Sequence, residues 1–467
     1  MTELPAVIGL EVHARLRTRS KMFCPCPVVD GAPPNTAVCP VCLGYPGTLP
    51  VPNAQAIRLG MRLALAAGAD VPPVSRWDRK NYFYPDLPKG YQVTQYREPL
   101  ARGGRVAGVP LERIHLEEDA ARLVREGVGE GRVGIDFNRA GTPLVEIVTA
   151  PVFRSPAEAA DWLRDLQALL RWIEVSDADP EAGAFRCDVN VSVGDGRKAA
   201  GTRVEIKNLN SFRAVRRALE YELERQRDLL AAGRRVRRET RAWDERAGRT
   251  APLRGKEEEA DYRYLPEPDL PPVVVEPGLL AEERAALPEL PEARSRRFAR
   301  ELAVEPGRAR LLCRHREVAD FFEEAVRSGA PAREAATWIL EEMPPGEPGR
   351  LAPAALADLL AMVRAGEVAR PAARQILEEL RRDGGDPREI AGRRGLGRLA
   401  DRDVLLRLAR EVLAARPELV DRWRRGREGV IGPLVGAVLA ASGGRADPRL
   451  AREILRELLG PPGGGRR

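Results

Sequence analysis

The feature that most constrains the fold is a change of residue pattern near residue 290. Before it, short runs alternate apolar and polar residues between glycines and prolines, as in 7–13 and 143–148, which is typical of strands and turns. After it, alanine, leucine, arginine and glutamate recur at helical spacing, as in 356–363. A chain with this pattern must build one body that contains a sheet and a second part made of helices.

Two helices are also expected inside the first part. One begins at Ser155 with a capping box, and the other runs from about Ser211 to Ala232 and stops at Gly233. The breakers at 383–386 and 392–397 then divide the helical part in two. We therefore predict an α+β class with three domains, at residues 1–290, 291–395 and 396–467, and a disordered end.

Composition limits the class of protein. No apolar run approaches the ~20 residues that span a bilayer, and the start of the chain lacks the basic and apolar stretches of a secretory signal. We therefore expect a cytoplasmic protein without a membrane partner. The net charge of +7 permits contact with a polyanion without demonstrating it. Only six of the 76 basic residues are lysines, and Lys80, Lys89 and Lys207 lie in segments with candidate chemistry. Where arginine is the general surface cation, the remaining lysines suggest a need for a compact ammonium donor. The alternative is that drift in nucleotide composition left these lysines by chance.

Four of the six cysteines form two close pairs, Cys24 with Cys26 and Cys39 with Cys42. Two tight pairs that flank a loop rich in glycine and proline allow four thiolates to converge on Zn²⁺. Such a site leaves no open position for catalysis, so we predict a structural zinc. The alternative is a set of reduced thiols or a redox pair.

Acidic residues stand inside otherwise apolar segments, together with two of the three histidines. They are Glu11 with His13, the run His115–Asp119, Glu146, Asp188 and Glu205. Side chains alternate across a strand, so Glu11 and His13 share one face, and alternation likewise groups His115 with Glu117 and Asp119. Oxygen ligands with one imidazole suit Mg²⁺ or Mn²⁺, and Mg²⁺ commonly accompanies a nucleotide phosphate. Ion pairs with arginine are the alternative.

Two further segments suggest anion and RNA contacts. Residues 205–212 read as a strand that runs into a helix N-terminus, where Lys207 and free N–H groups favour an anion, although Ser211 alone could be a simple cap. Residues 78–96 interleave basic residues with four of the eight tyrosines, which suits stacking of a single strand of RNA. Tyrosines that pack a loop are the alternative. A similar patch recurs at 261–264.

The same segments resemble the B subunit of the tRNA-dependent amidotransferase (GatCAB) family, in the family's order. They are IGLEVHARL (8–16), DRKNYFYPDLPKGYQ (78–92), HLEEDA (115–120), FNRAGTPLVEIV (137–148), RCDVNVSV (186–193), EIKNLNSF (205–212) and DYRYLPEPD (261–269). The resemblance implies a cradle-shaped mixed sheet domain, then a helical domain, then a small helical tail domain similar to YqeY.

The resemblance also implies a reaction. ATP phosphorylates the side-chain carboxylate of Glu on tRNA(Gln) or of Asp on tRNA(Asn), and ammonia from a partner amidase (A) subunit then displaces the phosphate. A small C subunit completes the heterotrimer. The sequence leaves open which charged tRNA is the substrate. The alternatives are a tRNA-holding scaffold without catalysis, and the archaeal-type E subunit, for whose large insertion this chain has no room.

Site residues follow from the resemblance one by one. The catalytic candidates are Glu11, His13, Glu118, Glu146, Asp188 and Glu205. Of these, His13, Glu118 and Glu146 are expected to bind Mg²⁺, a choice that prefers Glu118 over the Glu117 that alternation indicates. The candidates for the ATP phosphates are Lys80, Lys207, Asn208 and Asn210. The candidates for tRNA are Tyr82, Tyr84, Lys89 and Tyr91, with Arg424, Arg425 and Arg427 in the tail.

The tail departs from the family pattern. Where the family has a lysine-rich stretch before L-V-G-Q, residues 426–437 read GREGVIGPLVGA. Gly429 and Ala437 replace a usual lysine and glutamine, so we expect altered contact with the body of the tRNA.

Overall fold

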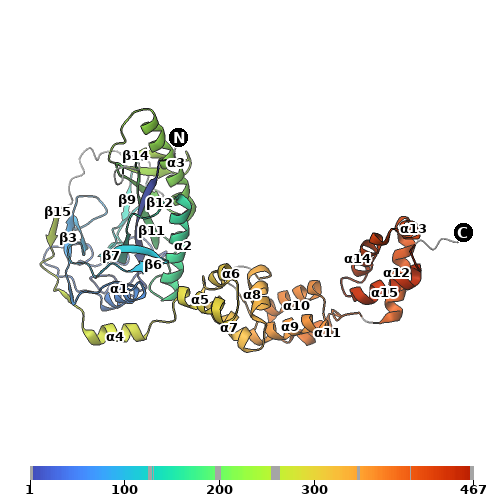
Figure 1. Cartoon of the computed structure of the whole chain (residues 1–467). Coiled ribbons are helices and arrows are strands. Elements are labelled where there is room, and N and C mark those ends of the chain that lie inside the picture. Colours follow the sequence, from blue (N-terminus) through green and yellow to red (C-terminus); the bar gives the residue numbers. More distant parts are fainter. Residues whose placement is uncertain are drawn as a thin grey trace. The chain divides into compact units, whose positions relative to one another are not determined.

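The chain forms two compact units, residues 1–291 and 292–467. The computed structural model describes residues 4–124, 129, 131–194, 201–253, 263–343, 348–399 and 401–462. Within these residues, the first unit combines sheets with helices and the second contains a run of helices (Figure 1). The predicted α+β class is confirmed.

A nine-stranded mixed sheet forms the centre of the first unit. Its order is β14 (Arg249–Pro252), β13 (Glu239–Asp244), β12 (Val204–Leu209), β11 (Phe185–Val193), β1 (Ala6–Arg15), β10 (Pro143–Thr149), β7 (Val109–Glu118) and β5 (Ala101–Arg102), with β6 (Arg105–Val106) also paired to β7. Among these strands, β12 and β13 run parallel and the other pairs run antiparallel. The strands that carry the candidate acids are therefore neighbours.

The alternation of side chains gives the central strands two different faces. On β1, Ile8, Leu10 and Val12 are buried, while Glu11 and His13, on the other face of the strand, are partly exposed. Helices α2 (Pro156–Trp172) and α3 (Phe212–Ala231) cover one side of the sheet (Figure 1). This arrangement leaves the polar face on the other side of the sheet.

Smaller elements complete the first unit. A three-stranded sheet of β15 (Arg263–Pro266), β3 (Asp78–Asn81) and β4 (Tyr91–Thr94) lies on the side of the main sheet away from α2 (Figure 1). The remaining elements are α1 (Ala54–Ala66), α4 (Pro277–Ala285) and the pairs β2 (Val74–Ser75) with β16 (Val273–Val274) and β8 (Arg122–Val124) with β9 (Gly134–Asp136).

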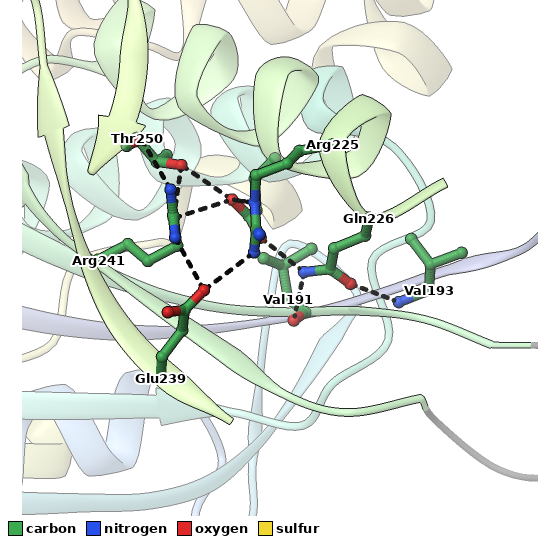
Figure 2. Close-up of polar contacts among 8 residues, drawn as sticks. Val191, Val193, Arg225, Gln226, Glu239, Arg241 and Thr250 are labelled. Carbon is green, nitrogen blue, oxygen red and sulfur yellow. Dashed lines mark hydrogen bonds and ion pairs between the residues drawn. The ribbon is translucent and has the colours of Figure 1, made fainter. Parts of the chain in front are cut away.

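A buried polar network ties α3 to the edge of the main sheet (Figure 2). Glu222 on α3 is 0% exposed, and it accepts hydrogen bonds from Arg225, from Gln226 at 2.9 Å and from Thr250 on β14 at 2.9 Å. Arg241 on β13 lies 3.5 Å from the same carboxylate, and Gln226 also bonds the backbone of β11. A buried carboxylate is costly unless paired in this way, so the network fixes the helix against three strands.

The second unit begins at Glu292, beside the change of residue pattern near residue 290. Its helices are α5 (Pro291–Glu301), α6 (Pro306–Leu312), α7 (Arg316–Arg327), α8 (Ala332–Glu341), α9 (Pro353–Ala365), α10 (Arg370–Asp383), α11 (Pro387–Arg393), α12 (Arg402–Ala415), α13 (Pro417–Arg424), η1 (Glu428–Val430), α14 (Ile431–Ala441) and α15 (Pro448–Leu459). The elements from α12 onward share one apolar core, with Trp423, Leu434 and Ile454 among its buried members. No helix among the described residues has the length and apolar character to cross a membrane. The predicted disordered end falls largely on residues 463–467, outside the described residues.

Candidate functional site

The register of three central strands brings a row of titratable side chains together. His13 on β1 lies opposite Glu146 on β10, and Glu146 lies opposite His115 on β7. Residues opposite one another in a sheet share a face, and Glu117 joins them because it lies two positions after His115. The row therefore combines residues that are up to 133 positions apart in the sequence.

The side chains of this row are within contact distance. His13 Nε2 lies 3.3 Å from Glu117 Oε1 and 3.3 Å from Glu146 Oε2. His115 Nε2 lies 3.2 Å from the same Glu146 oxygen. His13, Glu117 and Glu146 offer ligand atoms within 4.8 Å of one another, so they could hold a metal ion. Two carboxylates and an imidazole suit a divalent cation such as Mg²⁺ or Mn²⁺.

Electrostatics couple these groups strongly. Burial alone would lower the pKa of His13, but the carboxylates of Glu117 and Glu146 raise it to about 9. The same carboxylates raise the pKa of His115 against the effect of burial. Burial would raise the pKa of Glu146, but the two imidazoles lower it well below its ordinary value. The row is thus a set of paired opposite charges, and a bound cation would compete with the imidazole protons.

The expectation that Glu118 belongs to this row needs correction. Glu118 follows Glu117 on β7, so its side chain points to the opposite face. There it pairs with Lys89 and accepts a hydrogen bond from the N–H of Val93 at 3.0 Å. Strand alternation, which indicated Glu117, was the better guide here than the resemblance. Lys89 is also held in this pair, rather than extending freely from its loop.

A second group adjoins the row on β1, β11 and β12. Glu11 lies opposite Asp188, and Asn190 lies opposite Glu205. Lys207 Nζ lies 2.6 Å from Asp188 Oδ2 and 2.7 Å from Glu205 Oε1. The structure thus brings Glu11, Asp188, Glu205 and Lys207, all predicted from the sequence, onto one face.

In this second group, burial and neighbouring charges shift the pKa values. Burial raises the pKa of Glu11, and the carboxylates of Glu146, Asp188 and Glu205 add to the effect, while a hydrogen bond from Asn190 at 2.8 Å opposes it. Burial would lower the pKa of Lys207, but Asp188 and Glu205 raise it instead. Several carboxylates therefore depend on one ammonium group, and such a surplus of acid attracts cations.

The other predicted phosphate ligands lie near or just beyond the ends of β12 and β3. Asn208 adopts a left-handed backbone with φ of +66° and donates to the Trp243 carbonyl at 3.0 Å, and Asn210 is exposed. Ser211 caps α3 by accepting a hydrogen bond from the N–H of Ala214 at 3.0 Å, as the alternative interpretation of this segment predicted. Lys80 lies on β3 opposite Tyr264, with its ammonium 6.0 Å from the centre of the Tyr82 ring.

The aromatic segment divides into an exposed part and a packed part. Tyr84 is exposed beside Phe83, which is 94% exposed. Tyr91 is half-buried under the guanidinium of Arg79, 4.4 Å from its ring centre. Tyr96 stacks on Tyr264 with ring centres 3.9 Å apart. Part of the segment therefore packs within the fold, as the alternative predicted, and part of it is exposed to solvent. In the similar patch at 261–264, residues 261 and 262 lie outside the described residues.

The tail arginines are on the surface of the second unit. Arg424, Arg425 and Arg427 are exposed at and after the end of α13. Arg424 lies 3.8 Å from Asp421, which is a weak surface pair. Their guanidinium groups are accessible to a polyanion.

The four clustered cysteines come together around one point. Cys24, Cys26, Cys39 and Cys42 offer sulfur atoms within 4.8 Å of one another, so they could hold a structural metal. The N–H of Cys39 donates to Cys42 Sγ at 3.2 Å, and Lys21 Nζ lies 3.6 Å from the same sulfur. A hydrogen bond from the Cys24 thiol contributes most to lowering the pKa of Cys42, and the charge of Lys21 lowers this pKa further. A thiolate in such surroundings is a ready metal ligand.

Three groups at these sites were missed from the sequence. Lys21 is 1% exposed beside the cysteines, and no pattern around it signals burial. Arg113 lies on the same face as His115, which alternation could have indicated. The stacking of Tyr264 on Tyr96 joins segments far apart in the chain, so only tertiary structure could reveal it.

Comparisons with known proteins found matches over most of the chain. Residues 6–281 match the family described as the GatB/GatE catalytic domain, and residues 320–459 match the GatB domain. The chain is 45% identical to the B subunit of the aspartyl/glutamyl-tRNA(Asn/Gln) amidotransferase of Moorella thermoacetica, over 98% of this chain and 100% of that protein. It is 46% identical to the protein of the same name from Thermus thermophilus, over 97% of this chain and 99% of that protein. The His13–Glu146–His115 row lies within the region matched to the catalytic domain.

Proposed function

The chain belongs to the GatB family, the B subunits of aspartyl/glutamyl-tRNA amidotransferases, and we propose that it carries the carboxylate-activating step of such an enzyme. The substrates would be Glu on tRNA(Gln), Asp on tRNA(Asn), or both. The observation that carries the proposal is the polar face of the main sheet, where carboxylates, imidazoles and Lys207 gather in the region similar to the catalytic domain.

The proposed chemistry has two steps. An oxygen of the side-chain carboxylate attacks the γ-phosphorus of ATP, the bond to the β-phosphate breaks, and ADP leaves. Ammonia then attacks the carbonyl carbon of the acyl phosphate, and inorganic phosphate leaves with the former carboxylate oxygen. A free carboxylate is a poor acyl donor, which is why the reaction consumes ATP. Such transfers depend on positioning and on stabilisation of charge more than on covalent catalysis by the protein.

We assign the groups on the polar face to this chemistry. His13, Glu117 and Glu146 would hold Mg²⁺, which clamps nucleotide phosphates when it is bound. Glu11, Asp188 and Glu205 would supply the neighbouring acidic surface. Lys207 and Lys80 would balance the negative charge of the ATP phosphates, and Asn208 and Asn210 would orient the phosphate oxygens. Glu118 and Lys89 would serve the site indirectly, as a pair behind β7.

Other parts of the chain would hold the remaining partners. The four cysteines would bind zinc as a structural staple. Tyr82, Tyr84 and Tyr91 would contact the acceptor end of the tRNA, and Arg424, Arg425 and Arg427 its body. The proposal also includes a division of the chain into three domains, with boundaries at residues 290 and 395, and a place in the cytoplasm. An amidase (A) subunit would supply ammonia from glutamine, and a small C subunit would complete the complex.

The test measures ADP release by the chain assembled with its partner subunits, given ATP, Mg²⁺ and Glu-tRNA(Gln) without an ammonia source. We expect ADP release that needs the charged tRNA and is lost in Glu146→Gln and Asp188→Asn. The matched control is Glu112→Gln, which removes an exposed carboxylate from β7 outside the site. Equal ADP release by the site variants would refute the assignment. Tight tRNA binding without ADP release by the wild type would favour a scaffold subunit.

A further inference from the structure

Arg113 is a cation on the polar face that the proposed chemistry does not yet use. It lies on β7 two positions before His115, opposite Val148 on β10. Its Nη2 lies 3.7 Å from Glu146 Oε1, which is beyond hydrogen-bond distance. The guanidinium therefore forms an ion pair with one of the proposed cation ligands, Glu146, without a hydrogen bond to it.

At least one donor of Arg113 is unsatisfied. Its Nε atom is buried and has no hydrogen-bond partner among the described residues. A guanidinium presents five donors in a fixed planar fork, and a buried donor without an acceptor costs free energy. The side chain is still 27% exposed, so part of it is open to an incoming ligand.

Arg186 on the same face provides the contrast. Its Nη2 lies 2.8 Å from Asp119 Oδ1, which raises the pKa of Arg186. Arg186 is thus committed to a carboxylate of the protein. Arg113 has the same chemical group and a similar place in the sheet, but its nearest carboxylate is at 3.7 Å.

An aromatic side chain borders Arg113. Its guanidinium carbon lies 5.9 Å from the centre of the Tyr96 ring, and Tyr96 is in turn stacked on Tyr264. A ring at this distance attracts a guanidinium and limits its movement without using its N–H donors. The group is therefore oriented while its donors remain available.

We propose that Arg113 binds a substrate oxyanion beside the Glu146 cation site. The ligand is either a phosphate oxygen of the nucleotide or the side-chain carboxylate of the aminoacyl group, both of which the planar fork of arginine fits. This inference rests on the proposed function, in which both anions must meet on a face rich in carboxylates. Arg113 adds positive charge beside Glu146, where the carboxylates of that face would otherwise repel such anions.

The experiment compares wild type, Arg113→Met and Arg113→Lys in the assembled complex. Steady-state ADP release gives kcat and the KM values for ATP and for Glu-tRNA(Gln), and the Mg²⁺ concentration for half-maximal rate is measured alongside. Arg105→Met, which removes an exposed arginine from the nearby β6, is the control. We expect Arg113→Met to lower kcat/KM by about 10- to 100-fold, as for a lost hydrogen bond to a charged group, and Arg113→Lys to restore part of it.

The kinetic constants identify the oxyanion. A raised KM for ATP indicates phosphate, a raised KM for Glu-tRNA(Gln) indicates the carboxylate, and a lower kcat alone indicates the phosphoryl group in transfer. A change confined to the Mg²⁺ requirement, or a melting temperature that falls in parallel with activity, would overturn the proposal, because Arg113 would then only shape Glu146 or the sheet.

Binding measurements keep this test separate from the proposed function. Affinities for ATP with Mg²⁺, and for Glu-tRNA(Gln) against uncharged tRNA(Gln), are measured without turnover. If the wild type releases no ADP, the proposed function fails, and these affinities still decide the role of Arg113. Equal affinities of wild type and Arg113→Met for both ligands, with equal kinetics where turnover occurs, would overturn the proposal.

Discussion

Replacing Lys21 by methionine should loosen a metal from the cysteine cluster. Lys21 is 1% exposed, and its Nζ lies 3.6 Å from Cys42 Sγ and 3.3 Å from the Phe137 carbonyl oxygen. Zn²⁺ with four thiolates carries a net charge of about −2, which is unfavourable in a buried site without a nearby cation. Methionine keeps much of the length of the side chain and removes its charge.

The structure sets the size of the effect. Two unit charges 3.6 Å apart attract by about 4 to 5 kcal/mol at an effective dielectric constant of about 20. Burying the ammonium opposes several kcal/mol of that attraction. A net contribution of about 1.5 to 3 kcal/mol remains, as for hydrogen bonds to charged groups. We therefore expect zinc affinity to fall by about 10- to 100-fold, which is also the usual cost of losing a partner of a metal ligand.

The assay titrates the zinc-loaded protein with a chromophoric chelator of known affinity. Arg19→Met is the matched control, because Arg19 is an exposed cation two residues away. Melting temperatures at saturating zinc show whether Lys21→Met remains folded. If folded Lys21→Met holds zinc within about twofold of the wild type, the argument from buried charge is wrong.

Three further predictions concern the sheet and its sites. Glu222→Ala should lower the free energy of unfolding by about 3 to 5 kcal/mol in denaturant titrations, because it removes the buried carboxylate that pairs with Arg225 and Arg241; a change under about 1 kcal/mol would contradict this. Lys207→Met should lower ADP release by about 10-fold or more, because Asp188 and Glu205 lose the ammonium within 2.7 Å, and an unchanged rate would count against it. Removing metal with a chelator should speed amide hydrogen exchange in residues 20–45 before exchange in β1 changes. Equal acceleration in both segments would show that the metal does not stabilise the cysteine loop locally.

The sequence predicted the separate parts of the site better than their arrangement. The alternation of apolar and polar residues placed Glu11 and His13 on one face, and the same rule grouped Glu117 with His115. The choice of Glu118 failed because it overrode that rule. Two cysteine pairs with close spacing indicated a cluster that the fold does assemble.

Contacts between distant segments were beyond such rules. The pairing of β1 with β10 depends on a register that neither strand specifies alone, so strand patterns could not give the His13–Glu146 contact, and only the resemblance grouped these two residues. The burial of Lys21 and the stacking of Tyr96 on Tyr264 likewise depend on loops and strands that meet only in the folded chain. The change of pattern near residue 290 was visible because composition itself differs on the two sides.

The most direct test of the central claim follows one oxygen atom. Glu-tRNA(Gln) labelled with ¹⁸O in its side-chain carboxylate is converted by the assembled complex with ATP, Mg²⁺ and ammonia, and the inorganic phosphate is analysed by mass spectrometry. If the carboxylate is activated as an acyl phosphate, one ¹⁸O atom appears in the phosphate for each amide formed, and Glu146→Gln yields neither labelled phosphate nor amide. Amide formed with unlabelled phosphate, or labelled phosphate produced at the normal rate by Glu146→Gln, would contradict the account.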